Sequence, residues 1–263
     1  MEPGRAWTAM TVARVVTGTF REAGAVLGLL VVWQVVTMLL AVPVFLLPQP
    51  IVIAQAFASN VDPIARALLL TAMEAALGFI GGNLLGLVLA FVFVRSSLMS
   101  RVGLPLAIGL RSVPLIALTP LLTIIFGFGL TTIVIMAILI SFFPALVAGI
   151  TGLRAPAPEA LALMRALDAP ESLVYRRLRI PAALPYLFAA FKISAPASVL
   201  AAMVAEWTAA NSGLGYLILD AGGRYRFPLM WAAIVAATAL AVLAFVVASA
   251  AERRVIRWPV ETA

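Results

Sequence analysis

The charged side chains that could do chemistry in this sequence lie in or near long apolar stretches. They are Glu74, Arg111, Lys192 and Glu206. A charge at the centre of a membrane costs roughly 2.5–3.5 kcal/mol on insertion scales, so each should face protein or a water-filled cavity. Lys192 and Arg111 lie near segment ends and can extend their charges to the interface. Glu74 lies one helical turn before Gly78, and we expect it to make a buried hydrogen bond across a helix contact.

Glu206 begins a short polar run that also contains Thr208 and Asn211. We interpret these three residues as lining a pore or gate. The alternative is that Glu206 forms a structural ion pair, for which the candidate partners are Arg111, Arg224 and Arg226.

The sequence excludes most catalytic chemistry. It contains no Cys and no His, which rules out thiolate nucleophiles, Ser-His-Asp triads and imidazole metal sites. The single lysine, Lys192, follows no glycine-rich loop, so the chain holds no ATPase phosphate-binding loop. Glu74 and Glu206 lie in different segments and form no motif. We therefore expect no catalytic residue, no metal site and no cofactor, and any ATP must be hydrolysed by another chain.

The composition indicates that the surroundings of this protein are largely lipid. Hydrophobic residues make up 64% of the chain and charged residues 11%, against about 45–50% and about 25% in a soluble domain. Disordered, coiled-coil and nucleic-acid-binding proteins are excluded. The net charge of +7 then indicates positively charged cytoplasmic loops rather than a nucleic-acid partner.

Apolar segments predict an all-α, polytopic membrane protein of about six transmembrane helices, in a single domain over residues 1–263. Their approximate ranges are 24–47, 64–94, 103–126, 131–153, 183–210 and 228–250. The third contains Pro105, Pro114 and Pro120, which predicts a kinked or broken helix shielded by its neighbours.

The arginines predict the orientation in the membrane. Fourteen of them lie near the two termini and in the connections after the second and fourth segments, and three lie on the opposite side. The positive-inside rule therefore places both termini in the cytoplasm, with residues 1–23 as a cytoplasmic segment. The first apolar segment exceeds the about 7–15 residues of a signal-peptide core and ends at no clear cleavage site, so we expect it to be retained.

Small residues recur every four positions in the second segment, at Gly78, Gly82, Gly86 and Ala90. This pattern lets another helix approach closely. We expect tight packing within one subunit, and a contact between two copies is the alternative.

The only long polar connection, 154–181, reads as two short cytoplasmic helices. Pro158 suits the first turn of the first helix. Asp168 can cap the second helix, with Glu171 as its reciprocal partner, and that helix should stop at Pro181. Such a helical pair can dock into a groove on a partner, and the alternative is a solvated, positively charged loop.

Motifs along the chain match one family in order and spacing. They are Leu110-Arg111-Ser112-Val113-Pro114, Phe142-Phe143-Pro144, Arg179-Ile180-Pro181-Ala182-Ala183-Leu184-Pro185-Tyr186, Ala205-Glu206-Trp207, Ser212-Gly213-Leu214-Gly215-Tyr216-Leu217-Ile218 and Glu252-Arg253-Arg254. On these residues the chain resembles the permease subunits of binding-protein-dependent ABC importers, of the nitrate, sulfonate, taurine, bicarbonate and thiamine-precursor group. The resemblance covers nearly everything from about Asp62 onward.

The resemblance implies a type I importer permease in the cell inner membrane, moving a small anionic or polar solute by alternating access. Its implied partners are a second permease, two ATP-hydrolysing subunits, and a periplasmic or lipid-anchored substrate-binding protein. The permease pair would be a homodimer, and a heterodimer is the alternative. The pore would lie between the two permeases. The loop residues implied in coupling to the ATPase are Glu159, Leu163, Met164, Arg165, Leu167, Asp168 and Ala169.

The loop departs from the family signature, which is Glu-Ala-Ala with Gly six residues after the Glu. Alignment on Ile180 and Pro181 puts Ala162 in place of that Glu and Asp168 in place of that Gly. The docking role would survive, but pairing with the ATPase would be weakened or specialised.

Two other functions compete with this interpretation. A secondary transporter would need intramembrane ion sites and usually an internal repeat, and we find no convincing repeat. A membrane-embedded enzyme would need clustered carboxylates, which the sequence does not offer.

Overall fold

The structure is a computed structural model that describes residues 24–25, 27–111 and 113–258. These residues divide into two compact units. The first holds the described residues up to Asn60 together with 221–232, and the second holds Val61–Asp220 and the described residues from Ala233. All regular structure in the described residues is helical, so the predicted all-α class is confirmed.

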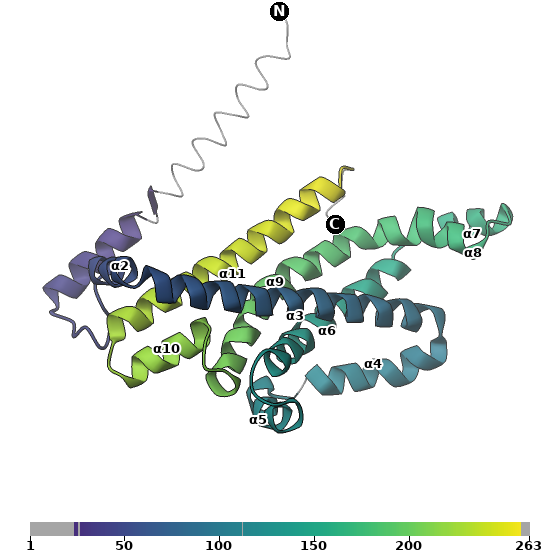
Figure 1. Ribbon diagram of the computed structural model, residues 1–263. Coiled ribbons are helices and arrows are strands. Elements are labelled where there is room, and N and C mark those ends of the chain that lie inside the picture. Colours follow the sequence, from purple (N-terminus) through teal and green to yellow (C-terminus); the bar gives the residue numbers. More distant parts are fainter. Residues whose placement is uncertain (1–23, 26, 112, 259–263) are drawn as a thin grey trace, which may run out of the picture. The chain divides into compact units, whose positions relative to one another are not determined.

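The larger unit is built around α6 (Leu130–Arg154), which packs against α3 (Val61–Arg95) and α9 (Ile180–Ala209). Figure 1 shows α3 as the long dark-blue helix. Within the described residues, four continuous helices are long and apolar enough to cross a membrane: Val61–Arg95, Leu130–Arg154, Glu171–Ala209 and Phe227–Val255, the last being α11. Of the six predicted segments, the first and third form shorter helices.

The smaller unit contains the helix Leu27–Leu39 and α2 (Pro50–Ser59). Gln34 Nε2 donates to Gln49 Oε1 at 3.0 Å, which ties the first helix to the start of α2. The rings of Trp33 and Trp231 lie 6.1 Å apart, so an aromatic contact holds residues 221–232 in the same unit.

The glycines of α3 lie against α6. A Cβ atom on Gly82 would fall 2.7 Å from both Ile138 O and Ser141 Cβ, and Gly78 and Gly86 meet Ala137 and Ala145 in the same way. The absence of side chains on these glycines therefore lets α3 and α6 approach backbone to backbone within one subunit.

The third apolar segment is divided into α4 (Ser97–Arg111) and α5 (Leu115–Phe126). Pro114 is the residue before α5, and proline disfavours the helical conformation of the residue before it. Gly127 and Gly129 have φ values of 82° and 102°. Glycine adopts such positive φ values most easily, and this turn leads the chain into α6. The broken helix predicted from the prolines is thus present.

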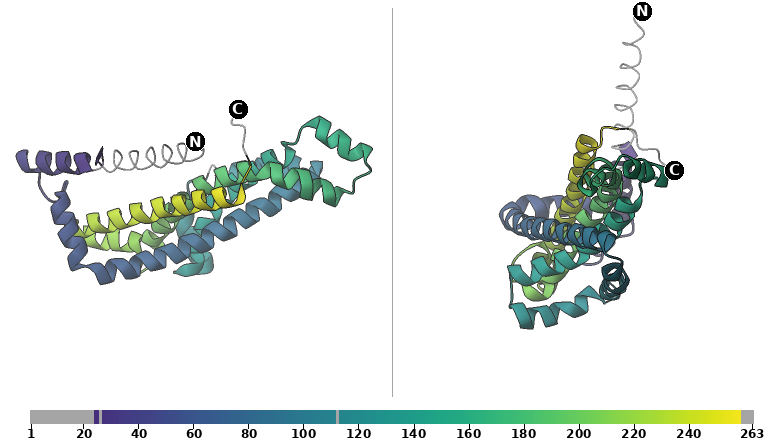
Figure 2. Two further views of the ribbon diagram at one scale, coloured as in Figure 1. Left: turned by 90° about the horizontal axis from the view of Figure 1, so that it is seen from above. Right: turned by 90° about the vertical axis from the view of Figure 1, so that its right-hand side faces the viewer.

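The long connection forms α7 (Pro158–Ala166), α8 (Glu171–Val174) and the π-helical segment η1 (Tyr175–Arg179), which runs directly into α9. In Figures 1 and 2 this part lies beyond the C-terminal end of α3. The prediction that the second helix stops at Pro181 is wrong. Pro181 lies in the first turn of α9, where a missing N–H is tolerated, and the π-helical turn before it keeps the chain helical.

The predicted cap of α8 by Asp168 is also wrong. Asp168 has a φ of 49° and forms the turn itself, in the left-handed conformation that glycine adopts most easily. The residue preceding α8 is Pro170, and no side chain caps the helix there. Two residues therefore separate Asp168 from the start of α8, and Glu171 pairs with Arg95 instead.

Candidate functional site

A buried polar network joins α3, the end of α9 and the start of α10 (Leu214–Gly223). Glu206 is fully buried. Its Oε2 accepts a hydrogen bond from the backbone N–H of Gly215 at 2.6 Å, and its carboxylate also accepts one from Tyr216. These amides belong to the first turn of α10, whose N–H groups lack partners within the helix. Glu206 therefore acts as a carboxylate cap for α10, where the helix dipole favours negative charge.

Thr71 connects this cap to α3. Its hydroxyl donates to Glu206 Oε1 at 2.6 Å and accepts from the backbone N–H of Leu214 at 2.8 Å. The turn before α10 has no room for a larger residue, since a Cβ on Gly213 would collide with the Glu206 carboxylate. Gly213 also has a φ of 102°, so both sterics and backbone conformation require glycine here.

Glu74 lies one turn after Thr71 on α3 and is 2% exposed. Its carboxyl group lies next to that of Glu206. It also lines a cavity of about 310 Å³, which opens among exposed residues that include Phe128 and Asn211. The remaining lining residues are Leu70, Met73, Gly129, Leu130, Ile133, Ala209, Ala210 and Ser212.

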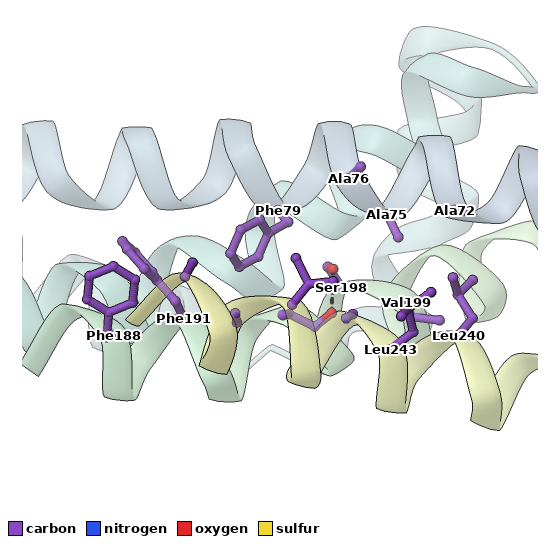
Figure 3. Close-up of a pocket in the computed structure, with 15 residues that line it drawn as sticks. Ala72, Ala75, Ala76, Phe79, Phe188, Phe191, Ser198, Val199, Leu240 and Leu243 are labelled. Carbon is purple, nitrogen blue, oxygen red and sulfur yellow. Dashed lines mark hydrogen bonds between the residues drawn. The ribbon is translucent and has the colours of Figure 1, made fainter. Parts of the chain in front are cut away.

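A second, larger cavity of about 480 Å³ lies between α3, α9 and α11. Figure 3 shows its alanine, phenylalanine and leucine walls. The hydroxyl of Ser198 is turned to its own helix and donates to Ala195 O at 2.8 Å. This cavity therefore presents no free polar group to a solute, and the Glu74 cavity is the better candidate for polar recognition.

The loop helices present apolar side chains at the other end of the bundle. Leu163 and Leu167 are 61% and 68% exposed, whereas Met164 is half-buried. Arg95 at the end of α3 pairs with Glu171, and Arg179 Nη1 donates to Leu153 O at 3.0 Å. These contacts join the loop to the ends of α3 and α6.

The remaining predicted coupling residues belong to the same loop. Glu159 lies in the first turn of α7 and Arg165 in its last turn. Ala169 is half-buried in the turn that follows, and its N–H donates to Met164 O at 3.0 Å. The structure thus brings all seven predicted coupling residues together on α7 and the turn after it.

The predicted pore or gate residues are not grouped together. Thr208 and Asn211 are exposed, whereas Glu206 is inside the chain. Thr208 and Asn211 remain candidates for a surface formed with a partner, and the geometry of Glu206 is that of a group that holds the α9–α10 turn. The segment 1–23 lies outside the described residues, as does the side chain of Arg111.

Two sets of contacts were not predicted from the sequence, namely those of Thr71 and the ion pair of Lys192. Thr71 carries no signal of its own, because its partners lie 135 or more residues away. Lys192 Nζ pairs with Glu252 Oε2 at 2.8 Å, which neutralises a lysine that we expected to reach the interface. The charge of Glu252 near the end of an apolar segment could have suggested this pair.

Comparison with known proteins gives one consistent result. Residues 82–257 match the family described as "Binding-protein-dependent transport system inner membrane component". A probable ABC transporter permease of Haemophilus influenzae is 32% identical, over 78% of this chain and 84% of the relative. The formylaminopyrimidine transport permease ThiX of Halalkalibacterium halodurans is 28% identical, over 88% of this chain and 93% of the relative.

The fold is similar to that of a solved importer. A chain of the MetNI methionine ABC transporter in an inward-facing conformation superposes with a TM-score of 0.61, at 21% identity. The similarity covers 75% of this chain and 96% of the other.

Proposed function

This chain belongs to the family of binding-protein-dependent transport system inner membrane components, and from this premise we propose that it works with separate ATPase subunits docked on the 154–181 loop. As a member it is a multi-pass permease subunit of an ABC importer for a small solute. We propose further that two copies form the translocation path between them and open it alternately to each side. A binding protein would deliver the solute to the outer face.

The observation that carries this proposal is the apolar surface of α7. Leu163 is exposed on α7 and Leu167 is exposed directly after its last residue, and the arginine distribution supports a cytoplasmic position for this helix. Exposed leucines on a helix at the end of a bundle suit insertion into a groove on a partner. The continuity of α8, η1 and α9 supports a coupling role, because a force on the loop would act directly on a spanning helix.

The location that we propose is the cell inner membrane, with both termini in the cytoplasm. A reporter fused to the C-terminus should be active on the cytoplasmic side. Activity restricted to the outer side would contradict this orientation.

The docking proposal is tested by the double change Leu163→Asp with Leu167→Asp. Both side chains are exposed, so the permease should still fold. Loss of an interface hot spot costs about 2 kcal/mol or more, which is about a thirtyfold loss of affinity. The measurement is co-purification of the ATPase with the permease, together with uptake by cells that express the complete importer.

The matched control is Leu98→Asp with Met99→Asp. These are also exposed apolar residues on the predicted cytoplasmic side, but they lie on α4. The control should retain the ATPase. If the α7 variant retains stoichiometric ATPase and full uptake, this loop is not the coupling element.

A further inference from the structure

The Glu74 cavity lies at the ends of α6 and α9 that are opposite the arginine-rich loop. Gly129 and Leu130 stand at the start of α6, and Ala209 is the last residue of α9. The other ends of these two helices carry Arg154 and Arg179. The positive-inside rule thus places the cavity in the outer half of the protein, where an imported solute would arrive first.

The two carboxyl groups at this position differ in their partners. Glu206 accepts hydrogen bonds from Thr71, Gly215 and Tyr216. Glu74 is equally buried, but its Oε2 accepts no hydrogen bond within the described part of the chain. A buried acceptor without a donor costs about 1–3 kcal/mol, so Glu74 would gain from a donor in the cavity.

The charge of the pair decides which donors fit. Both members of the pair are carboxyl groups, which can carry negative charge but never positive charge. The residues that line the cavity around Glu74 are otherwise uncharged, and none of them is basic. An anionic solute would find no cation among the lining residues, whereas a solute with N–H groups would offer Glu74 a donor.

We propose that the Glu74 cavity is a binding site for the transported solute and that it selects small solutes with N–H donors, neutral or cationic, over anions. This inference rests on the proposed importer function. It narrows the anionic or polar solute expected from the sequence to the polar, N–H-bearing class. The volume of about 310 Å³ is at the lower end of the ~300–1,000 Å³ of small-molecule sites, which suits a single small ring.

The test uses two probes on the full-length permease purified in lipid nanodiscs. The first is 4-amino-2-methylpyrimidine, a neutral ring with N–H donors, and the second is methanesulfonate, an anion without them. Ligand-observed NMR should detect binding of the aminopyrimidine and not of the sulfonate. Absence of aminopyrimidine binding at millimolar concentrations, or binding of the sulfonate instead, overturns the inference.

The variant Glu74→Gln keeps the size and the contact with Glu206 but removes one carboxyl oxygen. It should weaken aminopyrimidine binding about tenfold or more. The control Glu252→Gln makes the same chemical change in the pair with Lys192, away from the cavity, and should bind as the wild type does. Equal binding by Glu74→Gln and the wild type overturns the assignment of Glu74. If the variant folds poorly, the comparison of the two probes on the wild-type permease decides the question.

Failure of this inference can be distinguished from failure of the importer function. Co-purification of the ATPase with the wild-type permease is measured on the same preparations. If the ATPase co-purifies with the permease but the permease does not bind the aminopyrimidine, the proposed site is refuted and the importer function is not. Loss of the ATPase contact refutes the docking proposal, whatever the probes show.

Discussion

Replacing Gly82 by alanine should destabilise the permease, and the structure allows the effect to be estimated. The new Cβ would lie 2.7 Å from Ile138 O, whereas ordinary contacts begin at 3.4 Å. The helices α3 and α6 must therefore separate by about 0.7 Å, and overpacking of this kind costs about 1–3 kcal/mol. The gain in helix propensity from glycine to alanine offsets about 1 kcal/mol.

The neighbouring Gly81 provides a matched control on the same helix. A Cβ there would meet only the flexible end of the Ile138 side chain, at 3.0 Å. Gly81→Ala receives the same propensity gain without a backbone collision, so the two variants should differ by the overpacking cost alone. That cost corresponds to roughly 2–12 °C in Tm.

The assay is thermal unfolding of both variants in detergent, followed by circular dichroism. Gly82→Ala should unfold at the lower temperature, and its yield should fall with it. Equal unfolding temperatures would refute the reasoning, because they would mean that α3 and α6 do not approach each other at this glycine.

Three further changes test other contacts. Thr71→Val should lower the free energy of unfolding by about 1–3 kcal/mol, since a buried N–H and Glu206 both lose the hydroxyl; an unchanged Tm would contradict this. Asp168→Gly should leave the fold intact and raise Tm slightly, because glycine adopts a positive φ more easily; loss of the ATPase in co-purification would show instead that the Asp side chain is needed. Removing Arg95 or Glu171 should change Tm little, because both side chains are exposed. The change should be smaller still in high salt, which screens exposed charges. A large drop in Tm would show that the pair holds the loop.

The spanning helices could be predicted from the sequence because lipid imposes a strong pattern. Long apolar runs must satisfy their backbone hydrogen bonds internally, so they become helices. The prolines of the third segment then predicted a kinked or broken helix, since proline acts through its own backbone.

Contacts between distant segments could not be predicted in the same way. The donors to Glu206 are one hydroxyl on another helix and two backbone amides, which no side-chain pattern encodes. The pairing of Lys192 with Glu252 likewise depends on how α9 and α11 are positioned. The error at Asp168 has a local cause, because a capping sequence and a left-handed turn can use the same residue.

The unbroken helix from Glu171 to Ala209 has a mechanical consequence. The rise of 1.5 Å per residue puts Glu206 roughly 45 Å from Arg176 along the helix axis. A lever of that length converts a tilt of about 5° at its loop end into a displacement of roughly 4 Å at the other end. The Glu206 carboxylate, which caps α10 and lies next to Glu74, would move with this end of the helix. A movement of the 154–181 loop would thus loosen or tighten the Glu74 cavity through one continuous helix, without a hinge loop in between.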